Sequence, residues 1–265
     1  MTTITIPPGH DRAAGPAAAD ELRPVLLVCG ILSALFYAAM VGFVPMWWPG
    51  YSAASQTISE LSAIGAPTRS LWIALGVFYT LLVLGFGWGV WMTAGRSRRL
   101  RAAGGLIIAA GAIGPFWPPM HLRGAEPGLT DTLHIVFAIV WNLLSVATIV
   151  LAAAALGRRF RLYSAATLAV FVVFGTLTGM DGPRIARNLP TPWAGVWERV
   201  LVAAWLLWVV VLAAVLLRAS LARPARVPPR NGVPDEVKPM VETPAGAGPP
   251  RPWAGIGTSH AGADL

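Results

Sequence analysis

Few residues of this chain are able to do chemistry, and they fall between long apolar segments. Seven residues between positions 22 and 233 carry a carboxylate or an imidazole: Glu60, Glu126, Asp131, Asp181, Glu198, His121 and His134. Such side chains transfer protons, bind metals or pair with cations. The segment pattern places all of them on one predicted side of a membrane, where charged groups are costly unless paired or hydrated. That side is therefore the candidate location of a site.

The clearest local pattern lies between the first two apolar segments. Thr57 followed by Glu60 has the spacing of a capping box, in which a hydroxyl and a carboxylate bond free N–H groups at a helix start. Gly65 and Pro67 are typical of a helix end. Apolar residues repeat every three positions, at Ile58, Leu61 and Ile64. This spacing predicts a short helix on the membrane surface, in which Glu60 is a structural cap or a functional carboxylate.

A second polar group begins the fourth apolar segment. Asp131 precedes His134 by three residues, so it is expected to cap the helix while the imidazole lies near the first turn. At 100° per residue, His134 shares a helix face with Ser145 and Thr148, and Asn142 lies beside them. This stripe is expected to face other helices, where a hydrogen bond between spans contributes about 1 kcal/mol.

Glu198 and Arg199 begin the last apolar segment. Adjacent side chains at a helix start point in different directions, so each is expected to pair with another outer loop. The candidate partners are Arg69, Asp181 and Glu60. Such pairs would hold the outer ends of the helices together, and the alternative is that they bind an anionic headgroup or a small ligand.

Apolar helices must position these residues. The chain has 265 residues, of which 55% are hydrophobic and 12% charged, more apolar surface than a soluble core of that size hides. About 20 helical residues cross a bilayer core of about 30 Å. Six segments are candidates: residues 25–45, 71–93, 102–117, 132–156, 162–180 and 198–217. The sequence predicts an all-α transmembrane bundle of six helices over residues 24–218, between tails at 1–23 and 219–265.

The third segment is the weakest of the six. It is short, and prolines follow it from Pro115 onward. Its glycines are Gly104, Gly105, Gly111 and Gly114. Small residues let neighbouring helix backbones approach closely, so this segment is expected to span inside the bundle.

Arginine sets the predicted orientation. Residues 95–101 hold four Arg and residues 157–161 hold three, and such short basic loops face the cytoplasm. Six spans then place both termini in the cytoplasm of a multi-pass protein in the cell membrane. The same rule explains the net charge of +8, so nucleic acid is not an expected partner. Residues 219–265 hold nine Pro and little apolar periodicity, which predicts a disordered tail.

Several of these residues together resemble a known family. The segment from Ile58 to Pro67 (ISELSAIGAP), the histidine near the start of the fourth span, and Glu198-Arg199 followed by Trp205 and Trp208 are similar to the family catalogued as domain of unknown function 998. The similarity covers residues 25–217. The matching positions are Ser59, Glu60, Gly65, Pro67, His134, Glu198 and Arg199. Family members tend to have Phe-Pro with a nearby Asp where this chain has FWPPM at 116–120, so an acidic role there is not carried over. The resemblance implies a six-span membrane fold and no settled activity.

Three functions fit these residues, and the sequence favours a non-enzymatic membrane protein. Its outer polar cluster would bind a lipid headgroup or a protein partner, or hold the bundle together, and no cofactor is expected. A metal-dependent intramembrane hydrolase is the alternative, with a metal held by His121, His134 and a carboxylate such as Asp131 or Asp181, and with Ser59 or Glu60 assisting. A small-molecule transporter is the third, although the spans carry no ionisable residue at mid-membrane depth.

Overall fold

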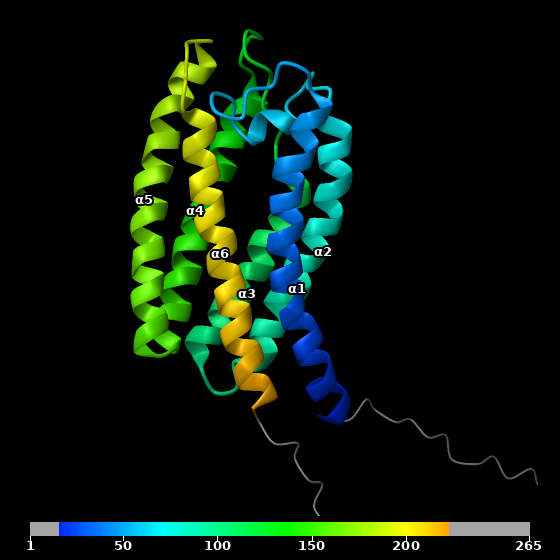
Figure 1. Cartoon of the computed structure of the whole chain (residues 1–265), viewed down its shortest axis with the longest axis vertical. Coiled ribbons are helices and arrows are strands. Elements are labelled where there is room, and N and C mark those ends of the chain that lie inside the picture. The colour runs from blue at the N-terminus through cyan, green and yellow to red at the C-terminus, as the bar shows by residue number, and fades with distance from the viewer. Residues whose placement is uncertain (1–15, 223–265) are drawn as a thin grey trace, which may run out of the picture. The chain divides into compact units, whose positions relative to one another are not determined.

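The structure is a computed structural model that describes residues 16–222. Its helices are α1 (Pro16–Phe43), α2 (Arg69–Thr93), α3 (Arg98–Ile113), α4 (Leu129–Ala155), α5 (Arg158–Ala186) and α6 (Ala194–Leu221) (Figure 1). Short 3₁₀-helices are η1 (Val44–Trp47), η2 (Ser59–Ser62) and η3 (Gly114–Phe116). Helix α1 therefore begins inside the predicted N-terminal tail. Most of the predicted disordered tail, from residue 223 onward, lies outside the described residues.

Five of these helices are long and apolar enough to cross a membrane. They are α1, α2, α4, α5 and α6. The protein is therefore a multi-pass membrane protein whose surroundings are a lipid bilayer. Helix α3 has 16 residues and is about 24 Å long at 1.5 Å per residue, which is less than a bilayer core of about 30 Å. The predicted third span at 102–117 is thus displaced toward the N-terminus, because α3 ends at Ile113 and the chain continues through η3, which contains Pro115.

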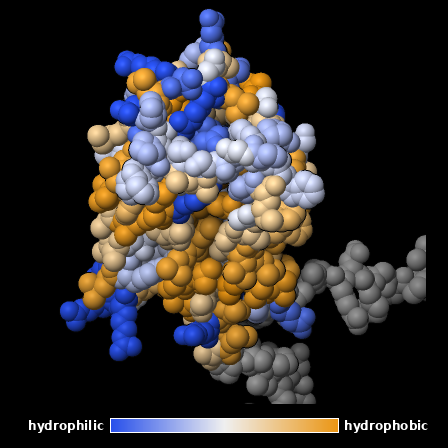
Figure 2. Space-filling model, turned by 45° about the horizontal axis from the view of Figure 1, so that its top comes forward, coloured by the Kyte–Doolittle hydropathy of each residue, from blue (hydrophilic) through white to orange (hydrophobic). Residues whose placement is uncertain are grey.

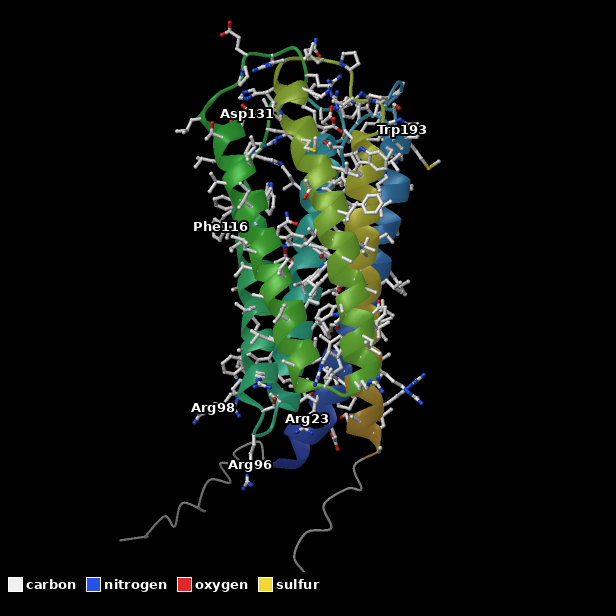
Figure 3. The ribbon with its side chains drawn as sticks, turned by 90° about the vertical axis from the view of Figure 1, so that its left-hand side faces the viewer. Arg23, Arg96, Arg98, Phe116, Asp131 and Trp193 are labelled. Carbon is white, nitrogen blue, oxygen red and sulfur yellow. The ribbon has the colours of Figure 1, made fainter. Side chains whose placement is uncertain are left out.

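The helix bundle has two chemically different ends (Figure 3). Asp131 and Trp193 lie at one end, which we call the cap end, and Arg23, Arg96 and Arg98 lie at the other, the arginine end. A space-filling view shows hydrophilic residues gathered over the cap end, a hydrophobic band below them, and hydrophilic residues again at the arginine end (Figure 2). This distribution matches a membrane helix bundle, in which lipid surrounds the middle and water both ends.

Glycines let α2 and α3 pack closely. A Cβ atom on Gly104 would lie 2.7 Å from the backbone nitrogen of Trp91, and one on Gly87 would lie 2.9 Å from that of Ile108. Real Cβ atoms do not approach so near, so only glycine permits this packing. The predicted close approach of the third segment to its neighbour is confirmed at Gly104. The short α3 is therefore held inside the bundle by its neighbours.

The predicted surface helix at 57–65 is wrong in both length and place. The segment forms only η2, and Ile58 and Leu61 are buried against Met40 and Val44 rather than facing lipid. The loop folds inward because its two apolar side chains fill the space between the cap ends of α1 and α2. The helical turn ends at Ser62, three residues before the predicted stop. Gly65 nevertheless has the predicted left-handed conformation, with a φ of +89°, a value that favours glycine.

Candidate functional site

Loops from three parts of the chain cover the cap end, and a buried ion pair joins them. We call residues 48–68, 117–128 and 187–193 the cap. Glu60 is fully buried, and its carboxylate accepts hydrogen bonds from Arg123 Nε at 2.7 Å and Nη2 at 3.0 Å. The backbone N–H of Thr57 also donates to Glu60, at 2.7 Å. The capping-box spacing thus occurs with one change, because the Thr57 hydroxyl donates to the carboxylate at 3.1 Å.

Arg123 also bonds the other two loops of the cap. Its Nη1 donates to the hydroxyl of Thr191 at 2.6 Å, and its Nη2 donates to the carbonyl of Ser55 at 2.8 Å. Thr191 itself donates to the Ser55 carbonyl at 3.1 Å. A bidentate arginine–carboxylate pair is strong and directional. Glu60 and Arg123 therefore hold the cap together, and their polar atoms are occupied by protein partners.

Arg199 fastens the first loop of the cap to α6. Its guanidinium donates to the carbonyls of Ala53 and Gln56 and to the hydroxyl of Tyr51, at 2.8, 3.0 and 2.7 Å. Burial raises the pKa of the Tyr51 phenol to about 12, so this hydroxyl stays protonated at neutral pH and donates to the carbonyl of Thr57 at 2.8 Å. Arg199 thus contacts another loop, as expected, but it pairs with carbonyl dipoles and not with a carboxylate.

Gly195 makes the loop's close approach to α6 possible. Its backbone N–H donates to the carbonyl of Ala54 at 2.9 Å. A Cβ atom at this position would lie 2.2 Å from the Gln56 oxygen and 2.4 Å from the Ala53 oxygen. Only a residue without a side chain fits here.

Glu198 bonds the same loop from the neighbouring position of α6. Its carboxylate accepts hydrogen bonds from the backbone N–H of Ile58 and, at 3.1 Å, from the hydroxyl of Ser59. The predicted partners of Glu198 and Arg199 are Arg69, Asp181 and Glu60. The contacts are different, because both residues bond the loop at 51–59 instead.

The two histidines of the cap end have separate partners. Asp131 accepts hydrogen bonds from Gly128 N–H and His121 N–H, and its carboxylate lies 2.7 Å from His121 Nδ1. His134 Nδ1 lies 2.7 Å from the carbonyl of Pro118 and 3.1 Å from the indole nitrogen of Trp117. These two contacts need opposite protonation of Nδ1, and the shorter one requires a proton there, which leaves Nε2 as the acceptor.

A metal centre finds no support in this arrangement. Within residues 16–222 no three His, Cys, Asp or Glu side chains are grouped so that they could bind a metal. His121 pairs with Asp131, whereas His134 contacts the segment at 117–118. Asp181 is partly buried near the cap end of α5 and takes part in none of these contacts. The ligands named for the metal-dependent hydrolase therefore do not converge.

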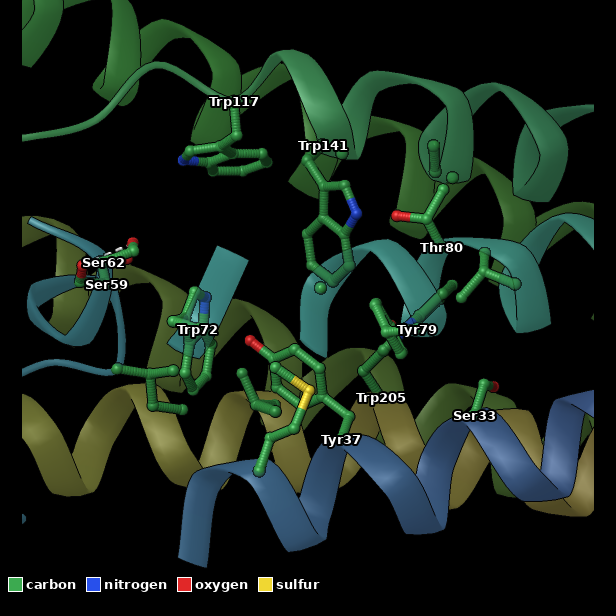
Figure 4. A pocket seen from close by; sticks show the side chains of 18 of the residues that line it. Ser33, Tyr37, Ser59, Ser62, Trp72, Tyr79, Thr80, Trp117, Trp141 and Trp205 are labelled. Atoms are coloured by element: carbon green, nitrogen blue, oxygen red, sulfur yellow. Dashed lines mark hydrogen bonds between the residues drawn. The ribbon is translucent and has the colours of Figure 1, made fainter. Parts of the chain in front are cut away.

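A cavity of about 450 Å³ lies beneath the cap. Its walls come from α1, α2, α3, α4 and α6, and η2 lies at its cap end. Several aromatic side chains line it, and Figure 4 shows rings from different elements around the open space: Tyr37, Trp72, Tyr79, Trp117, Trp141 and Trp205. This volume is within the usual range for small-molecule sites, about 300–1,000 Å³.

The cavity changes from polar to apolar along its length. Near the cap it is lined by Ser59, Ser62, Arg69 and Glu198, and farther along the bundle by Phe86, Ile107 and Val209. Trp72 and Trp117 would form part of an outer aromatic belt if placed by position alone, but they face this cavity. Ile73 and Val77 line it and are 49% and 55% exposed, which places them at a rim on α2.

The predicted site residues thus divide into two groups. Ser59, His134 and Glu198 line the cavity, whereas Glu60, Arg199 and Asp131 serve the cap. Of the predicted polar stripe, Ser145 and Thr148 are buried and Asn142 lines the cavity, so the stripe faces other helices as expected. Sequence reasoning missed four residues that matter here: Arg69 as a cavity residue, Arg123, Gly195 and Tyr51. A signal for the cavity was present, because Trp141 and Trp205 lie in the middle of spans rather than at their ends.

Comparison with known proteins confirms the family resemblance. A family model described as "Protein of unknown function (DUF998)" matches residues 31–215. The chain belongs to this family. The match covers α2 to α5 completely, together with the second half of α1 and most of α6, and includes every residue named as lining the cavity. Neither curated proteins nor solved structures give a match.

Proposed function

We propose that this DUF998 protein crosses the cell membrane six times, with the arginine end in the cytoplasm and the cap outside. The arginine-dense turns between α2 and α3 and between α4 and α5 both lie at one end, and the positive-inside rule assigns that end to the cytoplasm. Helix α3 would complete its crossing through η3 and the extended segment after it. Both termini are then cytoplasmic.

Cysteine labelling tests this orientation. Cys29 is the only cysteine, so a Cys29→Ala background is free of thiols. Glu126 in the cap and Arg159 in the first turn of α5 are both exposed. On intact cells a membrane-impermeant maleimide is expected to label the Glu126→Cys variant, and to label Arg159→Cys only after permeabilisation. The opposite pattern would invert the topology and place the cap in the cytoplasm.

We further propose that the protein binds an amphipathic molecule taken from the outer leaflet. The observation that carries this proposal is the cavity of about 450 Å³ that passes from a polar end under the cap to an apolar, aromatic interior. A headgroup matches the polar end, and an alkyl chain matches the interior, where burial contributes about 0.8 kcal/mol per methylene. The half-exposed Ile73 and Val77 give the chain a route from lipid.

Binding fits the polar residues better than chemistry does. The charged side chains of the cap are already bonded within the protein. Glu60 pairs with Arg123, and Arg199 bonds carbonyls of the first loop. His121 is paired with Asp131. The serine–histidine pair that is usual in hydrolases is not formed in the cavity, since Ser59 donates to Glu198 while His134 contacts Pro118 and Trp117. We therefore favour a binding protein over a hydrolase.

Filling the cavity is expected to weaken binding of the amphiphile. Gly76 lines the cavity, and a Cβ atom on it would meet no other atom within 4 Å, so Gly76→Leu puts a side chain into open space. Tryptophans line the walls, so a brominated alkyl amphiphile that enters should quench their fluorescence. Gly76→Leu is expected to raise the apparent Kd measured by this quenching at least about tenfold, which is a loss of about 1.4 kcal/mol of binding free energy.

Gly42→Leu is the matched control. Gly42 is an exposed helical glycine of α1 that also meets nothing within 4 Å and does not line the cavity. This variant should retain wild-type quenching. If both leucine variants bind the brominated amphiphile as the wild type does, the cavity is not the binding site and the proposal fails.

A further inference from the structure

Two opposite charges of the described residues line the cavity without a salt bridge to another side chain. Arg69, the first residue of α2, uses Nη1 to bond the carbonyl of Ser62 at 2.6 Å. Glu198 of α6 bonds only a backbone N–H and the Ser59 hydroxyl. Ion pairs among the described cap residues are His121–Asp131 and Arg123–Glu60. Neither Arg69 nor Glu198 takes part in them, and the two do not pair with each other.

Arg69 differs in this respect from the other cationic side chains that hold the cap. Arg123 makes four hydrogen bonds to the cap, and Arg199 uses its guanidinium on three carbonyls and a phenol. A guanidinium has five N–H donors, and Arg69 commits one nitrogen to the protein. Most of its donor capacity therefore remains for a ligand in the cavity.

The two charges lie on opposite sides of a polar roof. In a 3₁₀-helix, residues three apart share a face, and both Ser59 and Ser62 of η2 line the cavity. Arg69 bonds Ser62, the Ser62 hydroxyl donates to the Ser59 carbonyl at 3.0 Å, and Ser59 bonds Glu198. The roof thus runs from a cation on α2, past two hydroxyl groups, to an anion on α6.

Aromatic and apolar side chains continue beneath each charge. Trp72 follows Arg69 by three residues on α2, and Trp205 follows Glu198 by seven on α6, so each indole lies on the cavity face below its charge. Indole faces attract ammonium groups. A headgroup at the roof would therefore meet aromatic rings as well as charges, and its chain would continue among the rings.

From this arrangement we propose that the occupant of the cavity carries a zwitterionic headgroup, with its phosphate or carboxylate at Arg69 and its ammonium at Glu198. An unpaired charge near the membrane interior is costly, and a zwitterion satisfies both charges while adding no net charge. An anionic ligand would leave Glu198 unpaired, and a cationic ligand would leave Arg69 unpaired. This inference rests on the proposed binding function and specifies its ligand class.

A series of amphiphiles with the same dodecyl chain tests the headgroup. The probes are dodecylphosphocholine, dodecyl phosphate, dodecyltrimethylammonium and dodecylglycerol, each brominated at the chain end and added to protein in a neutral maltoside detergent. Quenching of tryptophan fluorescence gives an apparent Kd for each. The wild type is expected to bind the zwitterion about tenfold or more tightly than the other three, because only the zwitterion meets both charges with charge-assisted hydrogen bonds.

Two variants should give reciprocal results. Arg69→Gln is expected to weaken the zwitterion and the alkyl phosphate about tenfold and to leave the alkylammonium unchanged. Glu198→Gln should weaken the zwitterion and the alkylammonium and leave the alkyl phosphate unchanged or tighter. Arg184→Gln is the control, because exposed Arg184 bonds only the carbonyl of Pro190. Arg69→Gln removes a single hydrogen bond to the protein and is therefore expected to fold. Its binding results test the proposal even if Glu198→Gln does not fold.

The outcomes separate this inference from the proposed function. Equal affinity for all four headgroups, unchanged in Arg69→Gln, would overturn the zwitterion while leaving the cavity as a binding site. No quenching by any probe in the wild type would remove both proposals. Competition by free phosphocholine, lost in Arg69→Gln, would support the zwitterion and identify its source as a soluble molecule rather than a lipid.

Discussion

Arg123→Gln is expected to lower the free energy of unfolding by about 3–5 kcal/mol, because it leaves the carboxylate of Glu60 buried without its cation. Glu60 is 0% exposed, and Arg123 supplies two of its hydrogen bonds at 2.7 and 3.0 Å. The same substitution removes the bonds to Thr191 and Ser55. Thermal and denaturant unfolding in a neutral detergent, followed by far-ultraviolet circular dichroism, measures the loss.

Two further variants make this result specific. Arg187→Gln changes an exposed arginine of the same cap and should alter the unfolding free energy by less than about 0.5 kcal/mol. In Arg123→Gln combined with Glu60→Gln, the uncompensated charge is gone, so the double variant should be more stable than the sum of the single losses implies. Strictly additive losses would show that the two side chains do not act as a pair.

Gly195→Ala is the second substitution with a large expected effect. The added methyl group would lie 2.2 Å from the Gln56 oxygen and 2.4 Å from the Ala53 oxygen. These are backbone atoms that cannot rotate away, so the loop at 51–58 must move off α6 and lose its bonds to Arg199 and Glu198. We expect a loss of about 3 kcal/mol, at the upper end of the usual cost of overpacking.

The Gly195 variant also connects the cap to the cavity. Moving the loop displaces Ser59, which lines the cavity and bonds Glu198, so binding of brominated amphiphiles should weaken along with stability. Gly42→Ala, at an open position of α1, should be neutral or stabilise by up to about 1 kcal/mol, as alanine does in a helix interior. Unchanged stability and binding in Gly195→Ala would contradict the packing described for this loop.

Together the contacts distinguish residues that hold the cap in place from residues that line the cavity. Glu60, Arg123 and Arg199 are committed to fastening loops that come from distant parts of the chain. Glu198 belongs to both, because it bonds the loop and lines the cavity. A cap fixed in this way keeps the polar roof in place above the aromatic walls, which lowers the ordering cost of binding a ligand.

Much of the fold could be predicted from the sequence because its causes are local. Apolar runs of about 20 residues must form helices in lipid, where an unpaired backbone group is costly. Arginine-dense turns mark one end of the bundle, and Gly104 and its neighbours predicted a closely packed third helix. The end of that helix was predicted less accurately. The chain leaves the helix just before Pro115, and this position depends on how the following segment packs beside α2.

The helices, the chemical difference between the two ends and the family motif at 58–67 all follow from local sequence. Tertiary structure alone decided which charges pair, because Arg123 lies 63 positions from Glu60 and Glu198 lies 139 positions from Ser59. Pairing at such separations depends on where each loop comes to rest over the bundle, and local spacing does not encode it. The cavity could not be predicted for the same reason, because its walls come from five helices. Its two charged groups without salt bridges, Arg69 and Glu198, lie on different helices.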